Sequence, residues 1–361
     1  MQYILFYGEL PPSVINGVSL SNEKNIEILN DFYKIIKVEE KPVSSKYRWF
    51  SKIINIFYDF LSVRKKCRKY KFDFIYVSLP TSILGAFKIL TITTLSTFLL
   101  QKNRIVLHLH RGDFDKIYKN SFFYRLILNI LIKKTYRIVS LSEQHRRQLL
   151  NFFPDKKISV VTNTIREEFF IKKLTLDKIR FLYLSNYLGA KGIFHLLRAF
   201  TQLKKENINS NVELCCYGAF LDPSIKEEIL SYNGTNGISI HETLDGLDKI
   251  NVLEQIDALI LPSFNEGQPL SIIEAMYYEC AVITTDVGFI KEMLPIHYPL
   301  LLDSPDEKIL KTAMNKFISM NNNEKEKLVC ELKNNYDKNF SNSIHKTLVK
   351  KVFNCENNFC K

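Results

Sequence analysis

Short runs of β-branched and aromatic residues alternate along this chain with segments long enough to be helices, and this pattern restricts the fold most strongly. In the first half, the strand-like runs lie at residues 3–7, 33–38, 72–79, 104–110, 137–142 and 158–163. Segments of helical length separate them, for example residues 47–70 and 120–134. Such alternation is typical of crossover units, in which helices cover both faces of a parallel sheet. The first half is therefore expected to be a doubly wound α/β domain.

The alternation starts again after a polar, charged passage at residues 166–178, which has no clear period. Further strands are expected at residues 179–185, 212–217, 238–241, 258–262 and 281–285, and the first helix at residues 192–203. With 361 residues, the chain is long enough for two domains. We predict two Rossmann-like domains that face a central cleft, at residues 1–165 and 179–330, with a linker at 166–178 and a helical tail at 331–361.

Cysteine usage and hydropathy indicate the compartment. The seven cysteines are odd in number and form no Cys-x-x-Cys motif, as in proteins of reducing compartments. The N-terminal residues lack the basic segment of a secretory signal. Residues 82–100 are mostly apolar, but Lys88 and several threonines interrupt them, so a buried helix is favoured over a membrane span. A cytoplasmic protein is expected.

The chain is basic, with a net charge of +12. A cluster of lysines and arginines lies at residues 64–71, but no zinc finger, RNP-like strand or basic zipper accompanies it. Nucleic acid is therefore not an expected partner. The dinucleotide fingerprint Gly-x-Gly-x-x-Gly and the P-loop motif are both absent from the sequence, which argues against a dehydrogenase or an NTPase.

The main candidate site begins where the predicted strand at residues 257–263 ends. Glu266 lies in the following loop, Pro269 suits the first turn of the next helix, and Glu274 lies about one turn inside that helix. The apolar face of the helix is expected to consist of Leu270, Ile273 and Tyr277.

Ligands of open α/β sheets bind at this carboxyl edge of the strands. The segment Gly267, Gln268, Pro269 and Leu270 exposes backbone N–H groups that would suit an anion such as a diphosphate. Two carboxylates beside an anion would be explained by hydrogen bonds from sugar and ribose hydroxyls. Alternatively, Glu266 caps the turn and Glu274 lies on a solvated helix face, and the spacing does not separate the two interpretations.

The Glu-x7-Glu arrangement in EGQPLSIIEAM resembles the signature of glycosyltransferase family 4, whose members adopt the two-domain glycosyltransferase-B fold. Four more segments resemble the family in the same order: LFYGELPPSVINGVS, VLHLHRGDF, VVTNTI and LSNYLGAKGIFHLLRAF. The resemblance runs from the first strand to about residue 295. Each segment alone is weak evidence for the family, but the five segments in this order are highly specific for it.

The resemblance implies roles for matching residues in the second half. Glu274 would hold the ribose hydroxyls of a nucleotide, and Glu266 would contact hydroxyls of the transferred sugar. Lys191 would neutralise the diphosphate leaving group, which is usually the largest catalytic effect. The family often has an arginine five residues before this lysine, whereas this chain has Asn186. We expect Lys191 and helix N-termini to suffice.

In the first half, Gly17 would let the backbone approach the diphosphate. His110 matches the family's histidine that faces the donor sugar, and we expect His108 on the opposite face of the same strand. In the second half, Gly246 would border the nucleotide base, and Gly288 would lie near the sugar.

The family transfers sugars with retention of configuration and without a metal, so we expect neither a metal nor a cofactor. The Asp-x-Asp motif of Asp113 and Asp115 marks a divalent metal in other sugar transferases, but here we interpret both as loop residues. Paired carboxylates that flank a glycosidic bond suggest a double displacement, in which one carboxylate is the nucleophile, as in hydrolases. Because Glu266 is assigned to hydroxyl contacts, same-face attack is favoured, with the leaving phosphate taking the acceptor's proton. A UDP-sugar is favoured over a GDP-sugar as donor.

Residues 47–71 combine apolar residues with the basic cluster. The apolar residues are Trp49, Phe50, Ile53, Ile54, Phe57, Phe60 and Leu61. This helix would cover the sheet, lie on an anionic membrane, or do both.

We predict a peripheral hexosyltransferase at the inner face of the cytoplasmic membrane, which moves a hexose or N-acetylhexosamine to an undecaprenyl-diphosphate-linked saccharide in O-antigen or capsule biosynthesis. The alternatives are a catalytically weak nucleotide-sugar-binding protein, favoured by Asn186, and a basic nucleic-acid-binding protein.

Overall fold

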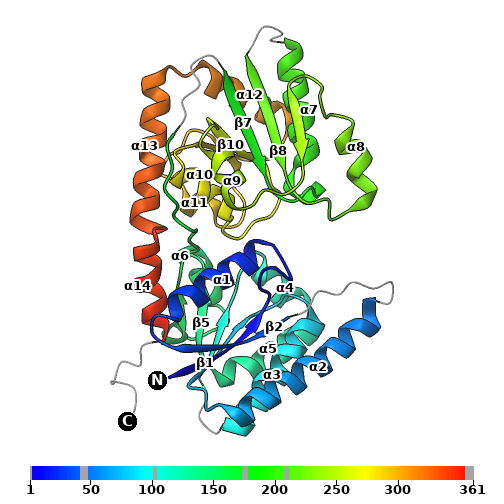
Figure 1. The fold of residues 1–361 in the computed structure, drawn as a ribbon, viewed down its shortest axis with the longest axis vertical. Helices are drawn as coiled ribbons and strands as arrows, with labels where there is room; N and C mark the ends of the chain where they lie inside the picture. The colour runs from blue at the N-terminus through cyan, green and yellow to red at the C-terminus, as the bar shows by residue number, and fades with distance from the viewer. Residues whose placement is uncertain (1, 41–47, 101–103, 173–177, 207–210, 354–361) are drawn as a thin grey trace. The chain divides into compact units, whose positions relative to one another are not determined.

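The computed structural model describes residues 2–40, 48–100, 104–172, 178–206 and 211–353, without the side chains of residues 48–53 and 99–100. The chain divides into two compact units, one of Met1–Thr164 with Asn342–Lys361 and one of Ile165–Ser341. Each unit contains a six-stranded sheet whose paired strands are parallel, with helices packed on it (Figure 1). The predicted doubly wound α/β fold is confirmed in both.

The sheet of the first unit has the strand order β2-β1-β3-β4-β5-β6. Its strands are β1 (Tyr3–Gly8), β2 (Lys34–Glu39), β3 (Phe74–Ser78), β4 (Arg104–His108), β5 (Thr135–Ser140) and β6 (Ile158–Val160). Its helices are α1 (Gly17–Leu29), α2 (Arg48–Lys69), α3 (Ile83–Leu100), α4 (Phe114–Asn120), α5 (Phe122–Lys134), α6 (Glu143–Leu149) and α14 (Asn342–Phe353).

Alternating side chains of the first unit's strands fill two separate cores. In β1, Leu5 and Tyr7 belong to the core beneath α2, α3 and α5, while Ile4 and Phe6 belong to the core beneath α1 and α14. Figure 1 shows α2, α3 and α5 side by side. The inner strands β1 and β3 are apolar along almost their whole length because both faces of the sheet are covered there, whereas the edge strand β2 exposes Lys34, Lys37 and Glu39.

The apolar stretch at residues 82–100 forms α3, a helix packed on the sheet as expected. Lys88, which interrupts the stretch, is buried and forms ion pairs with Glu40 and with Asp59, the latter at 3.9 Å. Asp59 also accepts a hydrogen bond from the Tyr7 hydroxyl at 2.6 Å. These partners compensate the charge that α3 carries into the core. Among helices of the described ranges, none combines the length and apolar character needed to cross a bilayer.

The sheet of the second unit has the strand order β12-β11-β10-β7-β8-β9. Its strands are β7 (Ile179–Leu184), β8 (Val212–Tyr217), β9 (Ile238–His241), β10 (Ala258–Leu261), β11 (Ala281–Thr285) and β12 (Leu301–Leu302). Its helices are α7 (Ile193–Glu206), α8 (Lys226–Leu230), α9 (Gly246–Leu253), α10 (Leu270–Tyr277), α11 (Ile290–Met293), α12 (Glu307–Ser319) and α13 (Asn322–Asn339).

The two C-terminal helices differ from the predicted helical tail at residues 331–361. Helix α13 belongs to the second unit and packs against α10, whereas α14 belongs to the first unit. In α14, Phe353 packs its ring against those of Tyr33, Phe74 and Tyr76. The chain therefore returns to its first unit, and its last described helix completes the core beneath α1.

Candidate functional site

Glu266 lies in the loop between β10 and α10, where two side chains hold its carboxylate. Its Oε1 accepts a hydrogen bond from Ser263 Oγ at 2.7 Å and pairs with Lys191 Nζ at 2.7 Å. The side chain of Glu266 is only 8% exposed, and a carboxylate so buried requires partners. The contact with Ser263 is the turn contact of the capping alternative. Glu266 therefore closes the turn and also meets the lysine predicted to act on the same ligand.

Two glycines let the loops after β7 and β11 reach this point. Gly192 follows the 3₁₀ turn Gly189–Lys191 with φ +73°, and a Cβ there would lie 1.9 Å from the carbonyl oxygen of Pro262. Gly288 has φ +60°, and a Cβ there would lie 1.9 Å from the carbonyl oxygen of Glu266. Only glycine fits either position, because both the backbone angle and the close approach exclude a side chain.

Glu274 is also ion-paired, with a lysine that the sequence did not single out. Its Oε1 lies 2.5 Å from Nζ of Lys249 in α9, and the Glu274 side chain is only 13% exposed. The solvated-face alternative for Glu274 is therefore wrong. One signal could have found Lys249: it lies one turn inside the helix after β9, as Glu274 does after β10, and parallel strands bring both to one sheet edge.

The start of α10 differs in detail from the prediction. Pro269 is the N-cap residue, one position before the helix, and Gln268 beside it is buried. The carbonyl of Gly267 accepts a hydrogen bond from the Phe289 N–H at 3.2 Å. The predicted apolar face was only partly right, since Leu270 and Tyr277 are half-buried. Helix α10 packs on β10, β11 and α13, and this buries a broader set of residues: Ile272, Ile273, Ala275 and Met276.

The other two predicted residues of this unit lie in nearby loops. Asn186 follows β7, is half-buried, and accepts a hydrogen bond from the Tyr183 hydroxyl on its backbone carbonyl at 3.0 Å. Gly246 is the first residue of α9 with φ +49°, and a Cβ there would have no atom within 4 Å. The backbone angle, rather than a close approach, favours glycine at this position.

In the first unit, His108 and His110 lie together, with ring centroids 3.9 Å apart. The expectation that His108 would be on the opposite face was wrong, because residues two apart on a strand share a face. His110 lies just beyond the end of β4, with its Nε2 3.4 Å from Ser78 Oγ. Desolvation of the ring lowers the pKa of His110 to about 3, so its imidazole is neutral at neutral pH.

His108 begins a buried polar network that the sequence did not predict. Its Nδ1 lies 2.6 Å from the Tyr76 hydroxyl, which accepts a hydrogen bond from Asn25 at 3.0 Å. Asn25 Oδ1 in turn lies 2.8 Å from Nε2 of His345, whose Nδ1 lies 2.6 Å from the carbonyl oxygen of Thr162. The network joins α1, β3, β4 and α14, so it fixes the end of β4 that leads to His110.

Gly17 is the first residue of α1, where Asn16 and Ser19 form a capping box. Gly17 is exposed, and a Cβ there would have no atom within 4 Å. The position is open, and within the unit no neighbour requires glycine there.

Asp113 and Asp115 both have cationic partners. The guanidinium of Arg111 donates to both carboxylate oxygens of Asp113, at 2.9 and 2.6 Å, and Asp115 lies 3.9 Å from Lys119. In the part of the chain that the structure describes, no group of three or more His, Cys, Asp or Glu side chains is arranged to hold a metal ion.

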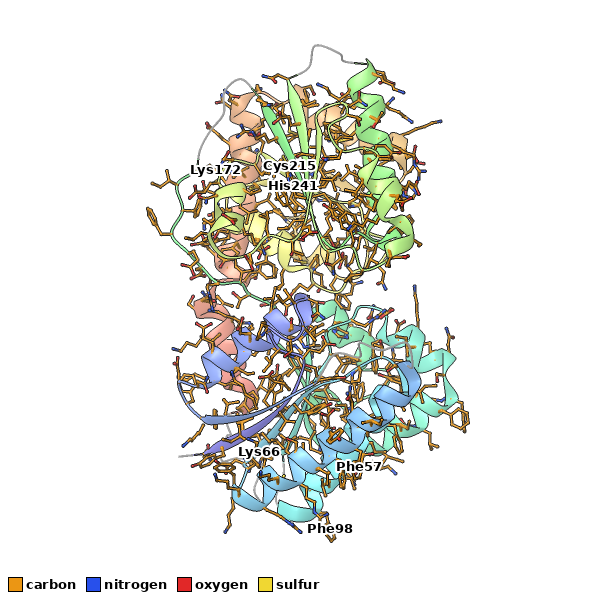
Figure 2. All side chains as sticks on the ribbon, turned by 45° about the vertical axis from the view of Figure 1, so that its right-hand side comes forward. Phe57, Lys66, Phe98, Lys172, Cys215 and His241 are labelled. Carbon is orange, nitrogen blue, oxygen red and sulfur yellow. The ribbon has the colours of Figure 1, made fainter. Side chains whose placement is uncertain are left out.

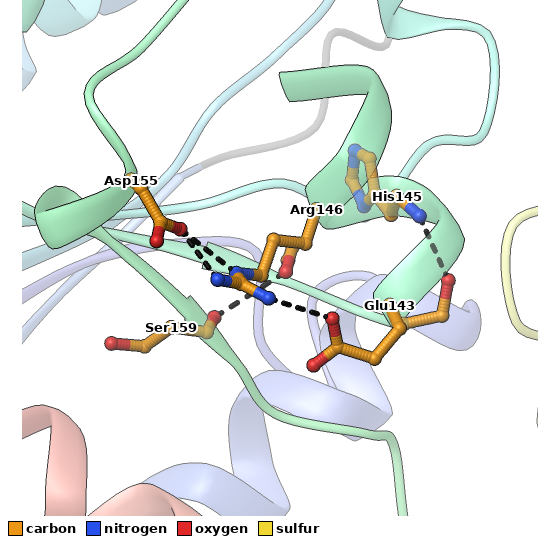
Figure 3. A network of polar contacts seen from close by, with 7 residues as sticks. Glu143, His145, Arg146, Asp155 and Ser159 are labelled. Atoms are coloured by element: carbon orange, nitrogen blue, oxygen red, sulfur yellow. Dashed lines mark hydrogen bonds and ion pairs between the residues drawn. The ribbon is translucent and has the colours of Figure 1, made fainter. Parts of the chain in front are cut away.

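A second charged cluster in the first unit is structural. Arg146 in α6 pairs with Glu143 at 3.0 Å and with Asp155 at 2.6 Å, and Figure 3 shows its guanidinium between the two carboxylates. Both carboxylates are exposed to solvent. The cluster ties α6 to the turn before β6, and exposed pairs of this kind add little to stability.

The second unit matches a family model. Residues 164–339 match the model described as "Glycosyl transferases group 1". The matched segment nearly coincides with the second unit and includes Lys191, Glu266 and Glu274.

Two curated relatives share part of the sequence. The chain is 26% identical over 147 residues to TuaC of Bacillus subtilis (strain 168), a proposed teichuronic acid biosynthesis glycosyltransferase, and the match covers 40% of this chain and 34% of TuaC. It is 25% identical over 155 residues to the capsular polysaccharide biosynthesis glycosyltransferase CapH of Staphylococcus aureus, over 42% of this chain and 43% of CapH. The matches therefore span less than half of either relative.

Among solved structures, HepE of Anabaena in complex with UDP and glucose has a TM-score of 0.69 to this chain. The two are 14% identical, and the match covers 97% of this chain and 98% of HepE. This likeness shows that the fold extends over both units, in agreement with the predicted glycosyltransferase-B architecture. The second unit, with its parallel sheet and its paired carboxylates, therefore contains a domain that matches the glycosyl transferases group 1 model over residues 164–339.

Proposed function

We propose that the chain is a glycosyltransferase that takes a hexose or N-acetylhexosamine from a nucleotide-diphosphate sugar, with UDP favoured as the nucleotide. The observation that carries the proposal is the pair of ammonium–carboxylate contacts at the carboxyl edge of the second sheet. Lys191 pairs with Glu266 and Lys249 pairs with Glu274, inside a group 1 glycosyl transferase domain. The similarity to HepE, which binds UDP and glucose, supports this choice of donor.

Three of these four side chains, Lys191, Glu266 and Glu274, retain capacity for a ligand. Within the described residues, the Lys191 ammonium has one acceptor, Glu266, so two of its three N–H donors are available to a diphosphate. Glu274, fixed by Lys249 through Oε1, presents Oε2 to ribose hydroxyls. Glu266 would accept hydrogen bonds from hydroxyls of the transferred sugar, and the segment from Gly267 to Leu270 would face the diphosphate. No metal ion is needed in this arrangement.

The proposed reaction retains the anomeric configuration by attack from the face that the leaving group departs from. The bond between the anomeric carbon and the phosphate oxygen breaks, the acceptor hydroxyl oxygen bonds to that carbon, and its proton passes to the leaving phosphate. Lys191 stabilises the negative charge that develops on the diphosphate. His110, neutral because burial lowers its pKa, is proposed to donate or accept a hydrogen bond with the donor sugar, with Gly17 near the diphosphate.

Donor binding can be tested by thermal stabilisation. We expect UDP-sugars to raise the unfolding temperature more than GDP-sugars, because a bound donor at 100 times its Kd adds about 2.7 kcal/mol to apparent stability. Glu274→Gln should remove most of this shift. Glu206→Gln, which breaks the exposed pair with Lys311, is the matched control and should keep it. The proposal would be contradicted if no nucleotide sugar raised the unfolding temperature.

The second candidate is a nucleotide-sugar-binding protein with weak catalysis, and Asn186 at the family's arginine position favours it. This protein would bind the donor but neither hydrolyse nor transfer it. Turnover of a labelled UDP-sugar separates the two. A nucleic-acid-binding protein would instead need a steeply salt-dependent affinity for DNA.

The first unit has an exposed apolar surface, which we name the three-helix face. It consists of the large apolar residues on the outer sides of α2, α3 and α5: Ile54, Phe57, Tyr58, Leu61, Ile83, Phe87, Phe98, Phe122, Phe123, Leu126 and Ile130. On α3 and α5 these residues recur every four positions, as in Ile83–Phe87 and Phe122–Leu126–Ile130. The inner sides of the same helices fill the core. Helix α2 therefore covers the sheet and also exposes apolar residues, and this exposure supports the membrane alternative for residues 47–71.

Basic residues lie at the C-terminal ends of two of these helices. The last turn of α2 contains Lys66, Arg68 and Lys69, and the last turn of α5 contains Lys133 and Lys134. An apolar face with a basic end matches an anionic bilayer, in which apolar residues enter the acyl boundary and lysines meet lipid headgroups. We therefore propose that the three-helix face rests on the inner face of the cytoplasmic membrane. There the enzyme would act on an undecaprenyl-diphosphate-linked saccharide of capsule or O-antigen synthesis. The relatedness to TuaC and CapH supports a cell-envelope polysaccharide.

The membrane contact is tested by sedimentation with liposomes. The wild type should bind vesicles that contain anionic lipid at low salt, and Phe57→Glu/Phe98→Glu should lower the partition coefficient at least about 10-fold, because burying one such side chain contributes roughly 1.5–3 kcal/mol. Figure 2 labels both phenylalanines and Lys66. The control is Phe169→Glu, an exposed phenylalanine of the second unit. If the wild type failed to bind anionic vesicles at low salt, the proposed membrane contact would be wrong.

A further inference from the structure

Lys172, in the segment that leads from the first unit into the second, places its ammonium among four acceptors of the second unit. Its Nζ donates to the carbonyl oxygens of Leu253 at 3.3 Å, Ile256 at 2.6 Å and Tyr278 at 3.1 Å. The fourth acceptor is Cys280 Sγ at 3.1 Å. Lys172 is labelled in Figure 2. Burial raises the pKa of the Cys280 thiol, so the thiol stays neutral and backbone carbonyls compensate the lysine's charge.

These carbonyls belong to the C-terminal ends of two helices. Leu253 is the last residue of α9, with Ile256 three residues beyond, and Tyr278 is the C-cap of α10. The last carbonyls of a helix have no partner inside it, and the helix dipole adds negative potential there. One ammonium therefore satisfies both helix ends and holds them together.

The same two helices carry the second ion pair of the site. Lys249 of α9 and Glu274 of α10 lie 2.5 Å apart, each about one turn before its helix ends. Helices α9 and α10 are thus joined twice, by Lys172 at their C-terminal ends and by the Lys249–Glu274 pair along their length. Loss of the Lys172 contacts would free α9 to shift along α10 and would move Lys249 away from Glu274.

The segment that carries Lys172 is itself fixed to this unit. The Ile171 N–H donates to Glu254 Oε1 at 3.1 Å, and the Glu168 carbonyl accepts from the Tyr277 hydroxyl at 2.8 Å. These contacts hold the backbone before Lys172 against α9 and α10, so the ammonium reaches the two helix ends from a fixed position.

We propose that Lys172 is a positioning residue for the nucleotide-sugar donor, which acts by fixing α9 against α10 so that Lys249 orients Glu274. The inference rests on the proposed function of Glu274 in donor binding. Lys172 is expected to affect the affinity for the donor, whereas Lys191 is expected to affect the rate of the chemical step.

A purely structural lysine on the same helix end provides the comparison. Lys333 of α13 donates to the carbonyl oxygen of Tyr277 at 3.3 Å and lies over the Tyr277 ring at 4.2 Å. It therefore contacts the C-terminal end of α10, and its described contacts do not include α9. Removing its charge should lower stability without moving Lys249 relative to Glu274.

The test compares Lys172→Met with Lys333→Met in the full chain, at a temperature well below both unfolding transitions. Lys172→Met should raise the KM and the Kd of the UDP-sugar donor about 10-fold with kcat within about two-fold, as expected for lost ground-state binding. Lys333→Met should leave both constants unchanged. Lys172→Ala should recover donor affinity when propylammonium is added, because the small cation can occupy the space that the lysine side chain leaves among its four acceptors. Lys172→Met cannot be rescued, since its side chain still fills the space.

The outcomes separate two failures. If the wild type binds donor and Lys172→Met binds it equally well, the positioning role is wrong while the proposed function stands. If Lys172→Met and Lys333→Met weaken donor binding equally, the effect is general destabilisation and the positioning role is also wrong. A wild type that binds no nucleotide sugar would overturn the proposed function and this inference together.

Discussion

Replacing Lys191 with methionine should lower kcat for sugar transfer at least about 100-fold, with a much smaller change in donor affinity. The expected loss is large because the diphosphate gains additional negative charge as the bond to the anomeric carbon breaks, so the lysine contributes most in the transition state. The structure places its ammonium 2.7 Å from the carboxylate predicted to contact the sugar. Single-turnover transfer from a labelled UDP-sugar at saturating donor measures the effect.

The control for this substitution is Lys311→Met. Lys311 also pairs with a glutamate, Glu206 at 2.5 Å, and its side chain is 21% exposed against 26% for Lys191. It lies in α12, away from the loops after β7 and β10, and its loss should leave kcat unchanged. If Lys191→Met kept kcat within about three-fold, the lysine would not stabilise the leaving group. Charge neutralisation would then have to come from the N-terminal end of α10.

The fold was largely predictable because parallel strands covered on both faces consist mainly of apolar residues. Residues 212–217, 238–241 and 281–285 were predicted as strands and coincide with β8, β9 and β11. The two-residue strand Leu301–Leu302 is too short to produce a pattern. The return of α14 to the first unit was not predictable from local spacing, because contacts such as that between Tyr33 and Phe353 join residues at opposite ends of the chain.

The candidate site likewise contains residues that a local motif reveals and residues whose role depends on distant partners. Glu266, Glu274 and Lys191 could be named as candidates from the sequence because each lies in a local motif. Lys249 was missed, since its meaning depends on a partner 25 residues away. Lys172 was missed for the same reason, because its acceptors lie 81 to 108 residues further on. Polar contacts between loops of a parallel sheet arise only when the strands assemble.

Gly288→Ala should lower the free energy of unfolding by about 3 kcal/mol, which is large for the addition of one methyl group. Two costs combine: a non-glycine residue at φ +60° is strained, and the new Cβ would lie 1.9 Å from the carbonyl oxygen of Glu266. A flexible side chain could rotate away, but a backbone oxygen moves only if the Glu266 loop moves. Urea denaturation followed by circular dichroism measures the loss.

Gly234→Ala isolates the first cost. Gly234 has φ +76°, but a Cβ there would have no atom within 4 Å, so only the backbone strain of about 1 kcal/mol applies. Equal destabilisation by the two substitutions would mean that the Glu266 carbonyl gives way without cost. If Gly288→Ala is the more costly, the folded fraction should also bind donor more weakly, because the only relief for the collision is displacement of the loop that holds Glu266 against Lys191. Gly288 would then act on the sugar through the backbone of Glu266, without touching the ligand.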